Sequence, residues 1–220
     1  MPAKPKLFEQ YRPRRWSEVV GQSAAIERLR CIAQRSLGSR PFWIAGPSGT
    51  GKTTIARLLA AEIADPDFVL EFDAGELTVG LLADLERQSH LWGGGQHGGR
   101  AYIVNEAHGL RKDAIRRLLV VLEAIPRHVV WIFTTTKAGQ DALFEDSIDA
   151  DPLLSRCERV DLAAAPEAFA VRAREIAQAE GLNGAPPDAY AALAARCKGN
   201  MRAMLNEIES GAMLAEGGKP

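Results

Sequence analysis

Cysteine, net charge and long apolar runs are all scarce in this chain of 220 residues. The three cysteines lie far apart, with no Cys-x-x-Cys pair and no histidine at metal-ligand spacing, which predicts reduced thiols and no zinc site. The formal net charge is -1, so any contact with nucleic acid must come from a local basic patch. No apolar run is long enough to span a bilayer, and residues 1–6 lack the apolar stretch of a signal peptide. The expectation is a soluble, cytoplasmic protein without a membrane partner.

A glycine-rich loop is the most informative stretch that is present. It follows the apolar run 42–45 and precedes a stretch, 55–64, whose spacing predicts a helix. Glycines let backbone N–H groups surround phosphates at the positive end of a helix, where a lysine adds charge and a threonine hydroxyl binds Mg²⁺. The spacing predicts binding of ATP with Mg²⁺, and an ordinary glycine turn is the alternative. The loop comprises Gly46, Pro47, Ser48, Gly49, Thr50, Gly51, the phosphate-binding Lys52, the metal ligand Thr53, and Thr54.

Short apolar runs between turn residues predict strands, and amphipathic stretches predict helices. The predicted strands cover residues 42–46, 68–73, 101–105, 128–133 and 158–162. The predicted helices cover residues 23–33, 55–64, 77–86, 110–123, 166–181 and 186–197, and one more opens at Gly199. The glycine-rich stretch 92–99 and the acidic stretch 140–151 are predicted to be loops, and the first is expected to be mobile.

The strand at 101–105 ends in Asn105, which is followed by Glu106. In sheets of this class, such a strand lies beside the strand that precedes the glycine-rich loop. Its end brings one group to the Mg²⁺ shell and the next to the attacking water. Asn105 keeps an oxygen that accepts a hydrogen bond from a metal-bound water, but it lacks the negative charge of an aspartate. Mg²⁺ affinity and hydrolysis are therefore in question, whereas nucleotide binding need not be.

The order of motifs resembles that of AAA+ ATPases of the clamp-loader group, which includes replication factor C small subunits and the bacterial DNA polymerase III gamma/tau type. The resemblance implies an α/β fold: a P-loop AAA+ module with a parallel five-stranded sheet flanked by helices, followed by a small three-helix lid. The first motif is an entry segment of Tyr11-Arg12-Pro13, then an aromatic residue, then Val19-Val20-Gly21-Gln22. The others are, in chain order, the glycine-rich loop, Asn105-Glu106, Ser155-Arg156-Cys157 and Gly199-x-x-Arg202. The implied parts are a disordered N-terminus at 1–6, a nucleotide-binding core at 7–164, a lid at 165–216 and a tail at 217–220.

The resemblance also implies catalytic roles. Glu106 would polarise the attacking water, and Asn105 would occupy the place of the Mg²⁺-organising aspartate and act through a metal-bound water. Thr135 or Thr136 would be the first sensor, between the γ-phosphate and that water. Arg156 would reach into the site of a neighbouring subunit, with a local salt bridge as the alternative.

Further residues would bind the rest of the nucleotide and DNA. Arg202 would be the second sensor, which couples the lid to the phosphates. The base and sugar would lie against Tyr11, Arg12, Pro13, Val20 and Gly21. DNA phosphates would be contacted by Arg111, Lys112, Arg116 and Arg117 on one helix. A simple solvated face of that helix stays equally open.

Clamp-loader ATPases work with other AAA+ subunits, on a sliding clamp and primer-template DNA, and the resemblance implies these partners here. Such subunits typically continue with a helical domain that forms the collar of a ring, whereas this sequence ends at Pro220 after the lid. A truncated chain or a short form without the collar is therefore expected. Two other functions stay open: a nucleotide-binding structural subunit with little hydrolysis, because of Asn105, and an AAA+ DNA remodeller in recombination or repair.

Overall fold

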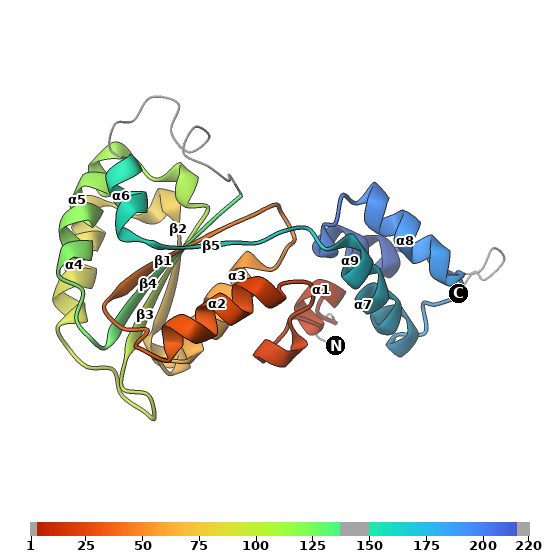
Figure 1. Ribbon diagram of the computed structural model, residues 1–220, viewed down its shortest axis with the longest axis horizontal. Coiled ribbons are helices and arrows are strands. Elements are labelled where there is room, and N and C mark those ends of the chain that lie inside the picture. The colour runs from red at the N-terminus through yellow and green to blue at the C-terminus, as the bar shows by residue number, and fades with distance from the viewer. Residues whose placement is uncertain (1–3, 137–149, 215–220) are drawn as a thin grey trace. The chain divides into compact units, whose positions relative to one another are not determined.

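The computed structural model of the chain describes residues 4–136 and 150–214 (Figure 1). The chain forms two compact units, which are described here one at a time. The sheet unit consists of Ala24–Gly46 and Lys52–Leu162. The helical unit consists of Met1–Ser23, Pro47–Gly51 and Ala163–Pro220. The tip of the glycine-rich loop therefore groups with the C-terminal helices, whereas Gly46 and Lys52 on either side of it group with the sheet.

The sheet unit contains five parallel strands in the order β2-β3-β4-β1-β5. This confirms the predicted parallel five-stranded sheet. The expectation that the strand ending at Asn105 lies beside the strand before the glycine-rich loop is wrong, because β4 lies between β3 and β1 and pairs with both. Because all strands run the same way, the ends of β1, β3 and β4 meet at one edge, and the register pairs Ala45 with Thr135 there. The strands are β1 (Arg40–Ala45), β2 (Val69–Asp73), β3 (Arg100–Asn105), β4 (Val129–Thr135) and β5 (Glu158–Asp161).

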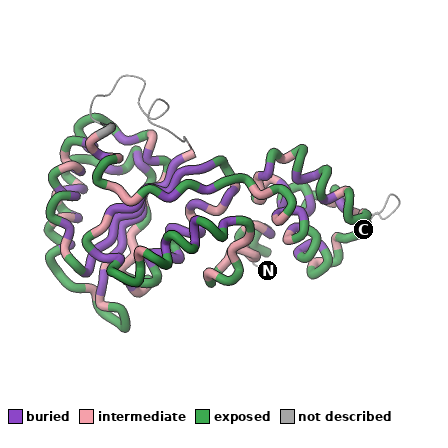
Figure 2. Tube along the Cα trace, in the orientation of Figure 1, coloured by how far each residue is buried: buried purple, intermediate pink, exposed green. Residues whose placement is uncertain are grey.

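Helices cover both faces of the sheet, which is why every residue of β4 is buried (Figures 1 and 2). One face packs a cluster of aromatic rings against α4 and α5, and the rings of Tyr102 and Trp131 lie 4.6 Å apart there. Helix α3 packs against β1, β3 and β4. The helices of this unit are α2 (Ser23–Ala33, whose first residue belongs to the helical unit), α3 (Lys52–Ala61), α4 (Val79–Ser89), α5 (Lys112–Glu123) and α6 (Ala150–Arg156).

The helical unit contains the short α1 (Leu7–Gln10) and three longer helices, α7 (Pro166–Ala179), α8 (Pro187–Arg196) and α9 (Met201–Glu209). Leu7, Tyr190 and Met204 belong to its separate apolar core. Proline at the first position of α7 and α8 lacks the N–H that would have no partner within the helix, and the Asn200 side chain caps α9 by accepting from the amide of Ala203 at 3.1 Å. The three predicted C-terminal helices are confirmed with small shifts of their ends.

The differences from the predicted elements are local. Helix α6 was not predicted, since its core-facing residues are few and a proline stands inside its first turn. The stretch 92–99 has no helix or strand, as predicted, although the amide of Gly93 donates to the carbonyl of Gly98 at 2.9 Å. Of the acidic loop predicted at 140–151, all but the last two residues lie outside the described part of the chain. No helix within the described ranges is both long enough and apolar enough to cross a membrane.

The three cysteines differ in exposure, and this leads to a testable prediction. Cys31 is exposed, whereas burial raises the pKa of the Cys157 thiol to about 12. The thiolate is the reactive form, so near neutral pH Cys157 should be alkylated about a thousandfold more slowly than an ordinary thiol. Peptide mass spectrometry after brief iodoacetamide treatment should find Cys31 modified first. Similar rates for these two cysteines in the folded protein would contradict the prediction, and denatured protein serves as the control.

Candidate functional site

The carboxyl ends of β1, β3 and β4 carry most of the site residues of the sheet unit. The chain leaves β1 at Gly46, whose amide donates to the carbonyl of Thr135 at 3.2 Å. A Cβ atom at Gly46 would lie only 2.5 Å from the carbonyl oxygen of Leu162, so a side chain does not fit here. The glycine therefore permits a close passage of two backbones where the loop begins.

Lys52 and Thr53 open helix α3 directly behind this edge. The ammonium of Lys52 donates to the carbonyl of Gly46 at 2.9 Å, although the residue is only 7% exposed. Thr54, the next predicted residue, is also buried. A buried cation at the amino end of a helix favours an anion, because the backbone N–H groups and the helix dipole act in the same direction. This corner of the sheet unit has the chemistry that binds a phosphate group.

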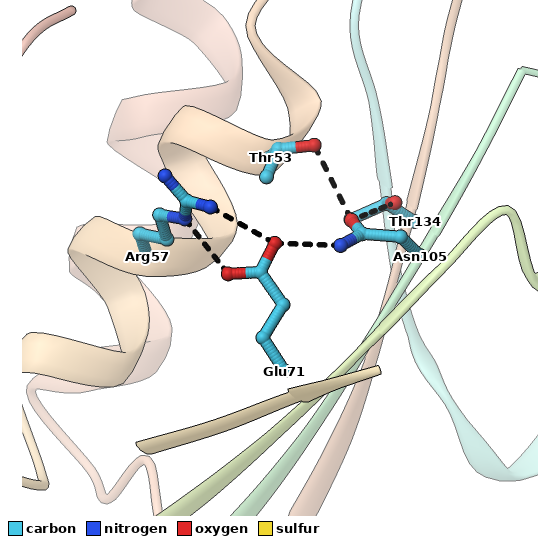
Figure 3. Close-up of polar contacts among 5 residues, drawn as sticks. All are labelled: Thr53, Arg57, Glu71, Asn105 and Thr134. Carbon is cyan, nitrogen blue, oxygen red and sulfur yellow. Dashed lines mark hydrogen bonds and ion pairs between the residues drawn. The ribbon is translucent and has the colours of Figure 1, made fainter. Parts of the chain in front are cut away.

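Asn105, at the end of β3, brings the predicted metal-shell groups together (Figure 3). Its Oδ1 atom accepts from the hydroxyls of Thr53 at 3.3 Å and Thr134 at 2.9 Å. Its Nδ2 atom donates to Glu71 on β2 at 2.7 Å. The Glu71 carboxylate is in turn held by both Nε and a terminal nitrogen of Arg57, at 2.8 and 3.1 Å. Five side chains from four elements thus form one hydrogen-bonded network.

The oxygens at this edge fit Mg²⁺, which prefers hard oxygen ligands and is usually held jointly by a few protein groups and the phosphates of a substrate. Thr53 supplies a hydroxyl, and Asn105 supplies a carbonyl oxygen 3.3 Å from it. Both are neutral, so the charge that balances the cation must come from the phosphates and from nearby carboxylates. No group of three or more His, Cys, Asp or Glu side chains in the described residues has the arrangement of a metal cage.

Glu106 follows in a strained conformation, with φ 51° and ψ 45°. The left-handed region costs a residue with a Cβ atom roughly 1–3 kcal/mol, and it persists where the surrounding structure requires it, commonly at functional sites. The Glu106 carboxylate accepts from the hydroxyl of Thr136 at 3.4 Å and lies 3.4 Å from Nδ1 of His108. The buried Thr135 instead lies 3.3 Å from that same His108 nitrogen. One of the two predicted sensor threonines, Thr136, therefore contacts the predicted base.

Arg156 lies at the opposite edge of the sheet. It ends α6 and borders a cavity of about 560 Å³ together with Arg35, Arg40 and Arg127 near the amino ends of β1 and β5. Along β1, from Arg40 to Ala45, the sheet is about 17 Å deep at about 3.3 Å per residue. Arg156 donates to Glu123 at 2.6 Å and to the carbonyl of Pro152 at 2.9 Å. The local ion pair named as an alternative is thus present, and Arg156 is far from Lys52 of its own chain.

The basic residues on α5 differ in their surroundings. Arg111, Lys112 and Arg116 are exposed at the beginning and outer side of the helix. Arg117 is half-buried and forms an ion pair with Glu86 of α4. The helix therefore presents three of the four predicted DNA-contacting residues on its surface and uses the fourth to join α4 and α5.

Within the helical unit, the tip of the glycine-rich loop packs against the start of α9. The carbonyl of Gly49 accepts from the amide of Met201 at 3.2 Å, and a Cβ atom at Gly49 would lie 1.9 Å from Oδ1 of Asn200. The hydroxyl of Thr50 closes the turn by donating to the carbonyl of Pro47 at 2.8 Å. Pro47, Ser48, Gly49, Thr50 and Gly51 are therefore brought to the same unit as Arg202, the next residue of α9 after Met201.

The predicted base-binding residues also belong to the helical unit. The hydroxyl of Tyr11 donates to Glu180 at the end of α7, at 2.8 Å. The guanidinium of Arg202 lies over the ring of Phe8, 5.5 Å from its centre. The remaining ones, Arg12, Pro13, Val20 and Gly21, lie in the segment between α1 and α2.

Some polar residues of these networks were not predicted as site residues. Thr134 is the first of three consecutive threonines, but the first sensor was predicted to be Thr135 or Thr136. Glu71 lies on β2, the strand beside β3. The sequence signal for it was a polar side chain within an apolar run. The buried Gln22 donates to the carbonyl of Ala163 at 2.7 Å and so joins two distant segments of the helical unit. Its place at the end of the Val-Val-Gly-Gln motif was the signal for it.

Sequence comparison with curated proteins gives relatives that include replication factor C small subunits and DNA polymerase III subunits. The chain is 30% identical over 208 residues to the replication factor C small subunit of Halobacterium salinarum, covering 92% of this chain and 61% of that protein. It is 26% identical over 227 residues to DNA polymerase III subunit tau of Bacillus subtilis, covering 92% of this chain and 38% of that protein. The chain thus spans about three fifths or less of the length of these relatives. The resemblance to clamp-loader ATPases is confirmed.

Solved structures share the fold. The RuvB Holliday junction branch migration motor of Thermotoga maritima matches 90% of this chain and 64% of its own with a TM-score of 0.67, at 20% identity. The R170A variant of the same protein gives a TM-score of 0.69. A family model described as "ATPase family associated with various cellular activities (AAA)" matches residues 42–162, which contain β2 to β5 and all of β1 except its first two residues. The chain belongs to this AAA family.

Proposed function

We propose that the chain is an ATP-binding subunit of the clamp-loader type, which works in an oligomer with other AAA+ subunits on a sliding clamp and primer-template DNA. The position of Arg156 carries the proposal. It lies at the amino edge of the sheet, whereas Lys52, Asn105 and Glu106 lie at the carboxyl edge. Such an arginine is of no use to the phosphates of its own chain, but an arginine supplied by a neighbour stabilises the charge of phosphoryl transfer. The names of the relatives support the choice of partners.

The proposed reaction is the hydrolysis of ATP. The loop amides and Lys52 hold the phosphates. Thr53 and Asn105 would hold Mg²⁺, which when bound would neutralise phosphate charge. Glu106 accepts a hydrogen bond from the attacking water and receives its proton, while Thr136 keeps the carboxylate in position. The oxygen of that water bonds to the γ-phosphorus as the bond to the bridging oxygen breaks, so that ADP and phosphate leave. Arg156 of a neighbouring copy contacts the transferred group, and the exposed arginines of α5 contact DNA phosphates.

Asn105 favours a second candidate function, a structural subunit that binds ATP and hydrolyses it slowly or not at all. A neutral amide gives Mg²⁺ less electrostatic stabilisation than a carboxylate. The third candidate function is a DNA remodeller, and the likeness to RuvB motors concerns the fold alone. Binding partners therefore test it: capture of a sliding clamp would support the clamp-loader type against the remodeller.

Replacing Glu106 by glutamine should separate ATP binding from turnover. Turnover should fall about 10²- to 10⁴-fold because the proton acceptor is lost, while ATP affinity stays nearly unchanged. Steady-state ATP hydrolysis with Mg²⁺, with and without primed DNA, measures the first, and equilibrium binding measures the second. Asp84→Asn, an exposed carboxylate on α4 paired with Arg87, is the control and should change neither.

The unmodified chain distinguishes the candidates in the same assay. Turnover that DNA stimulates, and that Glu106→Gln abolishes, supports the motor. Tight binding of ATP without turnover supports the structural subunit. No binding of ATP in the presence or absence of Mg²⁺ would overturn both.

A further inference from the structure

We propose that Glu71 is a positioning residue that fixes the direction of the Asn105 amide, so that its oxygen, and not its NH₂ group, faces Thr53 and the metal. The proposal rests on the proposed function in that the metal is the Mg²⁺ of bound ATP. Glu71 lies on the neighbouring strand β2, outside both the glycine-rich loop and the strand that ends at Asn105.

The argument begins with what each neighbour of the amide accepts and donates. An asparagine side chain has an oxygen that accepts and a nitrogen that donates, and exchanging the two changes its shape very little. The hydroxyls of Thr53 and Thr134 contact Oδ1 at 3.3 and 2.9 Å, but a hydroxyl both donates and accepts. These two threonines would therefore tolerate either direction of the amide.

Glu71 is different because an ionised carboxylate only accepts. Its Oε1 atom is 2.7 Å from Nδ2 of Asn105, and a reversed amide would place two acceptor oxygens at this distance (Figure 3). The bidentate pair with Arg57 fixes the plane of the carboxylate. Glu71 is the member of this network that discriminates between the two directions, and it turns the oxygen toward Thr53.

The direction matters because Mg²⁺ binds oxygen and is repelled by an NH₂ group. Groups that orient a metal ligand from behind typically change metal affinity by about 10- to 100-fold when they are replaced. The same contact explains why a neutral side chain suits position 105. An aspartate there would put a second carboxylate within hydrogen-bond distance of Glu71, where neither could donate and both would carry a negative charge.

The first test measures how strongly Mg²⁺ enhances nucleotide binding. The affinity for a non-hydrolysable ATP analogue is measured with excess Mg²⁺ and with EDTA, and the ratio of the two affinities is compared between variants. Glu71→Gln should lower this ratio about tenfold or more, with little change in EDTA. The control is Glu86→Gln, which breaks an Arg–Glu pair of similar burial between α4 and α5 and should leave the ratio unchanged. An equal loss with and without Mg²⁺ in Glu71→Gln would mean a structural role only and would overturn the proposal.

A pair of substitutions makes the test sharper. Asn105→Asp alone should raise the ratio little, because Glu71 opposes the new charge, whereas Asn105→Asp combined with Glu71→Gln should raise it much further. Equal effects of Asn105→Asp in both backgrounds would contradict the proposed coupling.

The side-chain amide of Asn105 gives a measurement that needs no nucleotide. Its NH₂ signals in a ¹⁵N-correlated NMR spectrum are those that disappear in Asn105→Asp. In the nucleotide-free protein these protons should exchange slowly with solvent, and Glu71→Gln should accelerate the exchange. Fast exchange in the unmodified protein would overturn the proposal even if ATP binds. Slow exchange together with no ATP binding would instead reject the proposed function and keep the role of Glu71 in orienting the amide.

Discussion

Arg156→Ala is expected to lower ATP turnover about a thousandfold or more, while each chain still binds ATP. An arginine supplied by a neighbour contributes about 10³–10⁵ to the rate of phosphoryl transfer, which corresponds to about 4 kcal/mol or more of transition-state stabilisation. The expectation follows from the position of Arg156 at the amino edge of the sheet, with Lys52, the proposed phosphate-binding residue, at the other edge. Steady-state hydrolysis at saturating ATP measures it at a protein concentration that favours assembly.

A control variant separates this role from a local one. Glu123→Ala breaks the same ion pair, at 2.6 Å, but leaves the arginine in place. If Arg156 only joins α6 to α5, the two variants should behave alike, and the trans role would be wrong. If Arg156 acts on a neighbour, Glu123→Ala should keep most of the activity.

A mixing experiment tests the same role in a second way. Arg156→Ala supplies an intact phosphate loop, and Lys52→Ala supplies an intact arginine, so mixed oligomers should contain some complete sites. Recovery of turnover on mixing the two inactive variants supports a shared site. Activity that stays at the sum of the separate variants would contradict it.

Trp131→Ala should reduce the free energy of unfolding of the protein by about 3–5 kcal/mol. Trp131 is 1% exposed on the central β4, and its ring lies 4.6 Å from that of Tyr102 and 6.1 Å from that of Phe133. Removing it leaves a large void in a closely packed layer under α5. Urea denaturation followed by far-ultraviolet circular dichroism measures the loss.

Trp92→Ala is the matched control, since the same atoms are removed from a residue that is 69% exposed. Trp92 stacks on His128 with ring centres 4.3 Å apart, and losing such a contact should cost about 1 kcal/mol or less. Similar losses for the two tryptophans would show that the aromatic layer does not carry the stability of the sheet.

The strands and the glycine-rich loop were predictable because their signals are local. A buried run such as 128–133 predicts a strand without knowledge of its neighbours in the fold. The spacing of the loop around Lys52 has few uses other than phosphate binding. The choice among Thr134, Thr135 and Thr136 was not predictable, since successive residues at a strand end point in different directions. In the structure Thr134 contacts Asn105, and Thr136 contacts Glu106.

The role of Glu71 could not be predicted from the sequence, for a different reason. Its contact with Asn105 depends on β2 lying beside β3 with Asp73 opposite Asn105, and such a register is a property of the folded sheet. The position of Arg156 likewise depends on the order of the strands, although the motif itself is visible in the sequence. The periodicity of one segment carries no information about its contacts with segments far apart in the chain.

The strand order also has a consequence for how the chain folds. Strand β1 pairs on one side with β4 and on the other with β5, so that Phe42 lies beside both Ile132 and Glu158. Long loops must therefore close before β1 gains a partner, and parallel pairings of this kind form slowly. During synthesis on the ribosome, the apolar residues of β1 emerge long before β4 and β5, and β1 has both partners only when the chain has been made almost to the start of α7. The nascent sheet is thus a natural target for chaperones that bind exposed apolar segments.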